Sequence, residues 1–129
     1  WAGARLRAPF RWGETDCAII CWEALDLMTG TSIAGMHRGR YRTEGEARRY
    51  QRRATSVLRA IVESGEAFAL KRTARLAFGD IIVAPRAGFL CGYVCLGKYV
   101  LSAWPEQGVA LGLTADAAAL ASTVTLRVP

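Results

Sequence analysis

"RWGETDCAIICWEALDLMTG", residues 11–30, joins a tight Trp-Gly loop to an Asp-Cys pair and a long apolar run. The side chains of Thr15 and Asp16 can accept hydrogen bonds from the free N–H groups of a first helical turn. Gly30 supplies a stop at the other end. The stretch therefore predicts a helix from about Asp16 to about Met28. Apolar residues occupy most of its circumference, so we expect a central, mostly buried helix.

The carboxy-terminal part of the chain, from Gly79 onward, changes to short β-type runs separated by turn residues. Such runs are typical of antiparallel strands joined by tight turns. We expect strands at 80–84, 89–96 and 98–103, an extended stretch at 108–113, a small helix at 115–122 and a last strand at 123–128. Helices followed by an antiparallel sheet predict an α+β fold. The 129 residues fit one domain, 1–129.

The part between the central helix and the strands is less regular. A short helix is expected within 2–8, and an irregular link over 31–41. Thr43 and Glu46 form a capping-box pattern that predicts a basic helix to about Arg53. A further helix is expected at about 56–64, whereas 65–76 gives no clear preference.

The charge of the chain is strongly positive. The net charge is +6, with 15 arginines against two lysines, and seven of the arginines fall within 37–53. This cluster fits either a solvated helix face or a surface for an acidic partner, which would be a protein, a nucleic acid or an anionic cell wall. The candidate binding residues are Arg38, Arg40, Arg42, Arg48, Arg49, Arg52 and Arg53. No apolar run reaches the roughly 18 residues of a membrane span.

The four cysteines form two pairs with i, i+4 spacing, Cys17/Cys21 and Cys91/Cys95. This is not the C-x-x-C spacing of common zinc sites. On a strand, the second pair would lie about 13 Å apart, so one metal ion could not easily bind all four. We favour buried free thiols, with a disulfide and a metal site as alternatives, and we expect no metal or cofactor.

Two motifs resemble the NlpC/P60 family of cell-wall peptidases, which have a papain-like fold. The first is the aromatic and Trp-Gly loop before Asp16-Cys17. The second is Gly79-Asp80 followed by "CGYVCLG", residues 91–97. The resemblance covers most of the chain and implies that Cys17 stands at the position of the catalytic nucleophile. It also implies that Cys17 and Cys91 are neighbours in space.

The chain departs from that family at the positions of the catalytic residues. The family's catalytic histidine falls on Cys91, and a tyrosine that often precedes the nucleophile falls on Phe10, which has no hydroxyl. Asp16 is a poor substitute base, because capping the helix would occupy it. His37 is the only histidine, and we expect it to be a solvated loop residue beside arginines.

The succession "FRWGETDC…TG…RGRY…GD" is still more similar to a subgroup that is encoded near the tail-tip genes of tailed phages and prophages. The resemblance implies a virion protein, made in the bacterial cytoplasm, that docks on tail-hub or tail-tip proteins and keeps a pseudoenzyme scaffold. Two alternatives stay open. One is an active peptidoglycan peptidase or amidase that uses Cys17, and the other is a basic nucleic-acid-binding module. No helix-turn-helix, OB or RRM signature supports the latter.

Overall fold

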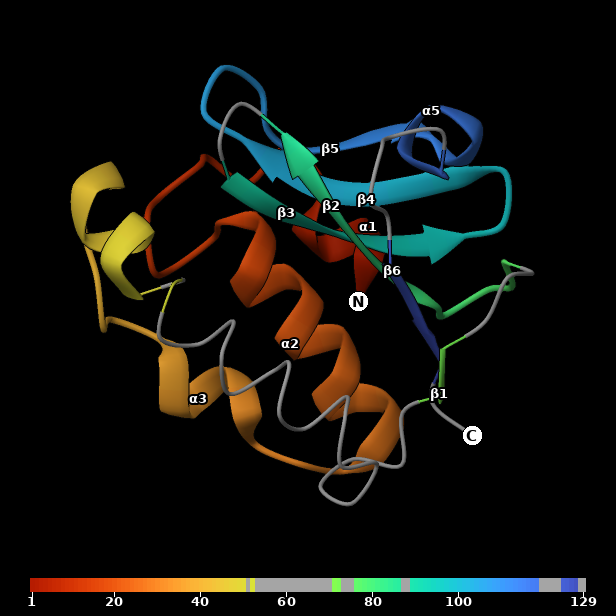
Figure 1. Cartoon of the computed structure of the whole chain (residues 1–129), viewed down its shortest axis with the longest axis horizontal. Coiled ribbons are helices and arrows are strands. Elements are labelled where there is room, and N and C mark those ends of the chain that lie inside the picture. The colour runs from red at the N-terminus through yellow and green to blue at the C-terminus, as the bar shows by residue number, and fades with distance from the viewer. Residues whose placement is uncertain (51, 53–70, 73–75, 87–88, 119–123, 128–129) are drawn as a thin grey trace.

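The computed structural model describes residues 1–50, 52, 71–72, 76–86, 89–118 and 124–127. An antiparallel sheet of six strands has the spatial order β1-β6-β2-β3-β4-β5. Its strands are β1 (Lys71–Arg72), β2 (Ile81–Arg86), β3 (Phe89–Leu96), β4 (Tyr99–Trp104), β5 (Gly108–Leu113) and β6 (Val124–Arg127). The helices are α1 (Ala2–Arg5), α2 (Cys17–Thr29), α3 (Ile33–His37) and α5 (Thr114–Ala118), and residues 44–50 are also helical. Figure 1 shows α2 crossing beside the sheet, with α3 on its far side.

The pairing of the strands confirms the expected α+β class. β2, β3, β4 and β5 follow one another as antiparallel neighbours, and β6 returns to pair with β2 on its other side. The predicted strands at 80–84, 89–96 and 98–103 are all present within a few residues. β2 runs two residues further than predicted, through Pro85 to Arg86. Among the described residues, β6 pairs with Ile81, Ile82 and Val83 of β2.

Helix α2 begins and ends where the sequence predicts. Gly30 adopts the left-handed conformation, with φ of 71°, and its N–H donates to the carbonyl of Asp26. Ile19 and Ile20 are completely buried, because the helix packs on β3 and β4. The central position expected for this helix is confirmed.

The hydrophobic core lies on both faces of the sheet. The cluster between α2 and the sheet contains Ile20, Leu25, Ile81, Val94 and Leu101. The cluster on the opposite face contains Ile82, Tyr93, Val100 and Ala117, and Ala117 comes from α5. Successive residues of β2 therefore serve different layers, as the two-residue period of a strand requires.

The prediction of an irregular link over 31–41 is wrong, because Ile33–His37 form helix α3. The side chain of Ser32, at the N-cap, makes no capping hydrogen bond. Instead Asp26 of α2 accepts from the backbone N–H groups of Ile33 and Ala34, at 2.6 and 2.9 Å. The cap that stabilises α3 is thus a contact between elements, which local pattern does not reveal. The helix predicted at 56–64 and residues 65–70 lie outside the described residues.

Candidate functional site

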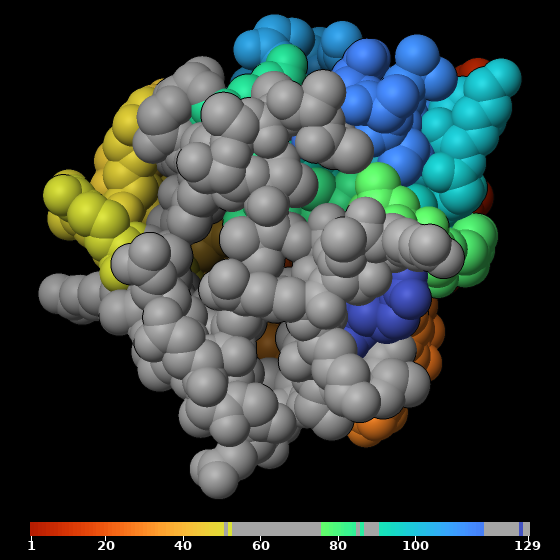
Figure 2. All heavy atoms as spheres, turned by 45° about the vertical axis from the view of Figure 1, so that its right-hand side comes forward, coloured from red at the N-terminus to blue at the C-terminus, as the bar shows by residue number. Residues whose placement is uncertain are grey.

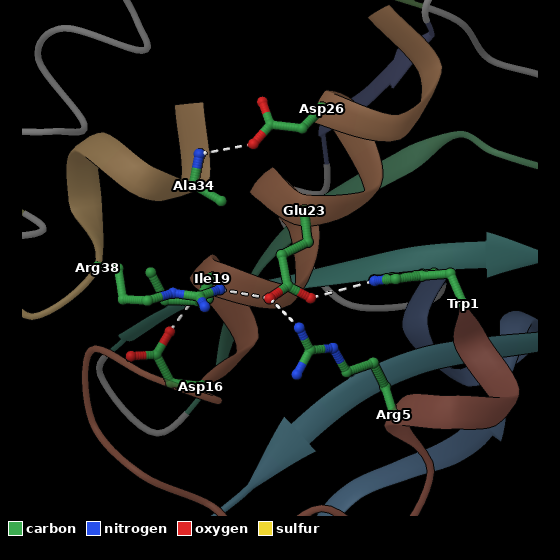
Figure 3. Close-up of polar contacts among 8 residues, drawn as sticks. All are labelled: Trp1, Arg5, Asp16, Ile19, Glu23, Asp26, Ala34 and Arg38. Carbon is green, nitrogen blue, oxygen red and sulfur yellow. Dashed lines mark hydrogen bonds and ion pairs between the residues drawn. The ribbon is translucent and has the colours of Figure 1, made fainter. Parts of the chain in front are cut away.

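Cys17 is the first residue of α2, and Asp16 caps that helix. One carboxylate oxygen of Asp16 accepts from the N–H groups of Ala18 and Ile19, each at 3.0 Å, and Figure 3 shows the second contact. The other oxygen accepts from the N–H of Gly13 at 2.6 Å. Asp16 is 2% exposed. It therefore organises the loop and the helix start, and it is not available as a base.

The Trp-Gly loop packs against residues 39–41. Gly13 has φ of +72°, and a Cβ on it would overlap the carbonyl oxygen of Tyr41. Gly39 donates a backbone hydrogen bond to Gly13, at 2.9 Å. Burial, and then the charge of Asp16 and a hydrogen-bond interaction with it, raises the pKa of Tyr41. A protonated phenol thus lies near Cys17, whose charge acts in the same direction.

The first turn of α2 lies directly on β3 at Gly92. A Cβ on Gly92 would stand 2.5 Å from Cys21 Sγ and 3.3 Å from the carbonyl oxygen of Cys17. Only glycine therefore allows the helix to approach the strand this closely. The backbone N–H of Gly92 also hydrogen-bonds to Cys17, which favours the thiolate form of Cys17.

A hydrogen-bond interaction with the thiol of Cys91, and then burial, raises the pKa of Cys17 well above its usual range. The same interaction lowers the pKa of Cys91, and the positive charge of Arg86 acts in the same direction. Two interacting thiols lose their protons in two steps. The first proton lost leaves a thiolate on Cys91 that accepts from the Cys17 S–H, so Cys17 stays protonated.

Arg86 and Tyr93 lie near Cys91, and the sequence motifs identified neither of them. Arg86, at the end of β2, lies over the ring of Trp104, with 5.4 Å from Cζ to the ring centroid. Burial raises the pKa of Tyr93, although a hydrogen-bond interaction with Arg86 acts in the opposite direction. Cys91 and Arg86 project near one another because Cys91 pairs with Ala84 on the neighbouring strand. No local pattern along the chain indicates this placement, because it depends on the register of two strands.

His37 is not the solvated loop residue that the sequence predicts. Its ring lies on Trp22 with a centroid separation of 3.5 Å, and its Nδ1 lies 2.7 Å from the hydroxyl of Tyr50. Burial, and then the charge of Arg40, lowers the pKa of His37. His37 is thus held as a neutral packing residue between α2 and residue 50. Neither of these contacts is with the cysteine pair.

Some of the candidate arginines form ion pairs within the protein, and others are exposed on its surface. Arg38 belongs to a cluster around Glu23, which is 8% exposed and also accepts from Arg5 Nη2 at 2.5 Å and from Trp1 Nε1 at 3.1 Å (Figure 3). Arg48 forms an i, i+4 ion pair with Glu44 at 2.9 Å. Arg38 is exposed, and the other exposed candidates are Arg40, Arg42, Arg49 and Arg52, while Arg53 lies outside the described residues. Arg38 thus has a structural role that the charge pattern did not show.

Asp80 of the Gly-Asp motif has a structural partner far along the chain. Its two carboxylate oxygens accept hydrogen bonds from Arg127 at 2.8 and 2.7 Å. Oδ2 also accepts one from the backbone N–H of Ala77 at 2.7 Å. The hydrogen bond from Arg127 holds the pKa of Asp80 below its usual value. Figure 2 shows the green segment before β2 against the dark blue end of β6. A hollow of about 280 Å³ beside this ion pair is lined by Met28, Ala77, Phe78, Gly79, Asp80 and Arg127.

Among the residues that the structure describes, no group of three or more His, Cys, Asp or Glu side chains is placed to hold a metal ion. None of the described helices is long and apolar enough to cross a membrane.

Comparison with known proteins places the chain in a family. The family model described as "Domain of unknown function (DUF6950)" matches residues 1–121. The chain therefore belongs to the DUF6950 family. No curated protein matches the chain, and neither does any solved structure.

Proposed function

We propose that this member of the DUF6950 family is a structural protein of a phage tail tip, built on a papain-like NlpC/P60 scaffold that has lost its hydrolase chemistry. The observation that carries the loss of chemistry is the Cys17–Cys91 contact. A cysteine begins the central helix, and the first turn of that helix packs on an antiparallel strand. That arrangement is the one the resemblance implies, but the strand offers a second thiol where a peptidase needs an imidazole.

The missing imidazole matters because a cysteine peptidase needs two proton transfers. A base must take the proton from the thiol, and an acid must then protonate the leaving amine. Such help is worth about 10² to 10⁴ in rate. Cys91 does neither for Cys17, since its own thiolate forms first and keeps the Cys17 proton in place. The single histidine of the chain is engaged by Trp22 and Tyr50.

The tail-tip role rests on the resemblance and on the basic surface. Four exposed arginines, Arg40, Arg42, Arg49 and Arg52, come from one continuous part of the chain. Arginine suits bidentate pairing with carboxylates at a protein interface. The proposed partner is therefore an acidic surface of a tail-hub or tail-tip protein in the virion. Nucleic acid would use the same charges, but binding to it would weaken steeply with salt.

The loss of hydrolase chemistry is tested with purified protein and peptidoglycan sacculi. We expect the same low peptide release from the wild type and from Cys17→Ala. Cys91→His restores an imidazole beside Cys17 on the same scaffold, so we expect its Cys17 to react faster with iodoacetamide near neutral pH. Release of stem peptides by the wild type that disappears in Cys17→Ala would establish the peptidase alternative instead.

The docking role is tested by charge reversal in the phage. Arg49→Glu with Arg52→Glu changes two exposed arginines of the basic helix. Arg11→Glu with Lys98→Glu makes the same change in net charge at exposed positions elsewhere. We expect only the first pair to reduce the copy number of the protein in purified tails. Normal incorporation of the first pair would refute docking through this surface.

A further inference from the structure

We propose that Cys17 and Cys91 form an oxidation site, at which a peroxide converts the two thiols into an intramolecular disulfide between α2 and β3. This inference is independent of the tail-tip role, because it concerns only the two sulfur atoms and their surroundings. It would hold for any DUF6950 protein with this pair of side chains.

The packing of α2 on β3 brings the two cysteines close together. The absence of a side chain at Gly92 lets the first turn of α2 rest on β3, so that a Cβ at Gly92 would stand 3.3 Å from the carbonyl oxygen of Cys17. Cys91 directly precedes Gly92 in β3, and each of the two thiols shifts the pKa of the other. A disulfide needs Cβ atoms about 3.5–4.5 Å apart, which two cysteines on elements packed this closely can reach by a small adjustment. Both cysteines are half-buried rather than enclosed, so a small oxidant can reach them.

The electrostatics distinguish the roles of the two sulfurs. Cys91 is the better thiolate, because it accepts from the Cys17 S–H and lies near Arg86. Its partner Cys17 keeps its proton until Cys91 has reacted. A low-pKa thiolate with a second thiol in contact is the usual arrangement of an attacking and a resolving cysteine.

The oxidation balances in two steps. The Cys91 thiolate attacks one oxygen of hydrogen peroxide, the O–O bond breaks, and the departing hydroxide takes up a proton to become water. Cys91 is then a sulfenic acid. The Cys17 sulfur next attacks the Cys91 sulfur, the S–O bond breaks, and the hydroxide that leaves combines with the Cys17 proton as a second water. The pair of sulfurs loses two electrons, and the peroxide gains them.

The remaining cysteines are poor competitors for this reaction. Cys21 is 4% exposed, and desolvation raises the pKa of its thiol far above the usual range. Cys95 is 1% exposed, and its S–H points to the carbonyl oxygen of Gly97 at 3.8 Å. Both thiols lie in the interior, where oxidation is slow.

The test uses the reduced chain of residues 1–129, treated with a small excess of hydrogen peroxide, then denatured and alkylated with N-ethylmaleimide. The wild type should lose two hydrogen atoms in mass and take up two maleimides instead of four. Cys21→Ala with Cys95→Ala keeps the proposed pair and should still lose two hydrogen atoms. Cys17→Ala with Cys91→Ala keeps the other two thiols and should take up two maleimides before and after peroxide.

Fragment-ion sequencing of the oxidised wild type decides the pairing even if a variant fails to fold. The cross-link should join Cys17 to Cys91, and dithiothreitol should reverse it. The disulfide closes a long loop, so oxidation should raise the Tm by roughly 10 °C. A cross-link through Cys21 or Cys95 would overturn the proposal. Full alkylation of all four thiols after peroxide would also overturn it.

Discussion

Because α2 contacts β3 at Gly92, we predict that one methyl group added at this position strongly lowers the free energy of unfolding. In Gly92→Ala, the new Cβ would stand 2.5 Å from Cys21 Sγ and 3.3 Å from the carbonyl oxygen of Cys17. The second neighbour is backbone and cannot rotate away. Because Cys21 is buried in the core between α2 and the sheet, the helix itself must shift. Overpacking of this kind costs about 1–3 kcal/mol, and we expect a value near the upper end.

The matched control is Gly112→Ala, on the edge strand β5. A Cβ there would meet Val100 and Trp104 side-chain atoms at 3.5 and 3.7 Å, which is ordinary contact. We expect a change within about 0.5 kcal/mol, because a surface substitution without a clash has little effect. Thermal and urea unfolding of both variants measure the difference.

A double-mutant cycle identifies the clash as the cause. Cys21→Ala removes the sulfur atom that the Gly92→Ala methyl group would overlap. The double variant should therefore be more stable than the sum of the two single effects predicts, by about 1 kcal/mol or more. The relief is partial, since the Cys17 carbonyl oxygen stays in place. Strictly additive free energies of unfolding would show that the close approach of Cys21 to β3 is wrong.

Three further predictions concern buried carboxylates. Glu23→Gln leaves two arginines without their charged partner and should lower the free energy of unfolding by about 2 kcal/mol, whereas Glu44→Gln, in an exposed pair, should cost at most about 0.5 kcal/mol; equal losses in urea unfolding would contradict this difference. The pKa of Asp80 is lowered by folding, so its charge contributes stability above its ordinary pKa, near 4, and this contribution is lost as the pH falls through the lower folded value. The stability advantage of the wild type over Asp80→Asn should accordingly shrink in acid, and an advantage constant with pH would exclude the ion pair with Arg127 as its source. Asp16→Ala frees three backbone N–H groups and should cost about 2 kcal/mol or more, and retention of wild-type Tm would refute its role as the organiser of the loop.

The expected features that the structure confirms are those encoded by short segments. The start of α2 depends on a side chain that bonds to N–H groups two and three residues later, and its end depends on a glycine with positive φ. Both signals are complete within a few residues of sequence. The strands were predictable for the same reason, because turn residues and β-type runs alternate along the chain.

The juxtaposition of Cys17 and Cys91 has a different origin. It was expected only from the resemblance of two motifs to a peptidase family, and the structure places the first turn of α2 against β3 at Gly92, the residue after Cys91. The assignment of Cys17 and Cys91 as vestigial catalytic positions stays a prediction, and so does the phage-tail role. Tyr41, which supplies a hydroxyl near Cys17, was present in the "RGRY" stretch of the sequence. Its proximity to Asp16 depends on the packing of the loop around Gly13 against residues 39–41, which the sequence pattern does not show.

The sequence by itself determined the position of α2 and of the strands β2 to β5, because propensity, capping and turn formation act over a few residues, whereas α3 depended on a contact from α2. The tertiary structure decided the partners of the charged groups: Asp26 with the start of α3, Arg38 with Glu23, and Arg127 with Asp80 across 47 positions. A charged side chain lowers its free energy with whichever opposite charge or free N–H group folding brings within reach. That choice depends on strand register and helix packing, so no pattern along the chain records it.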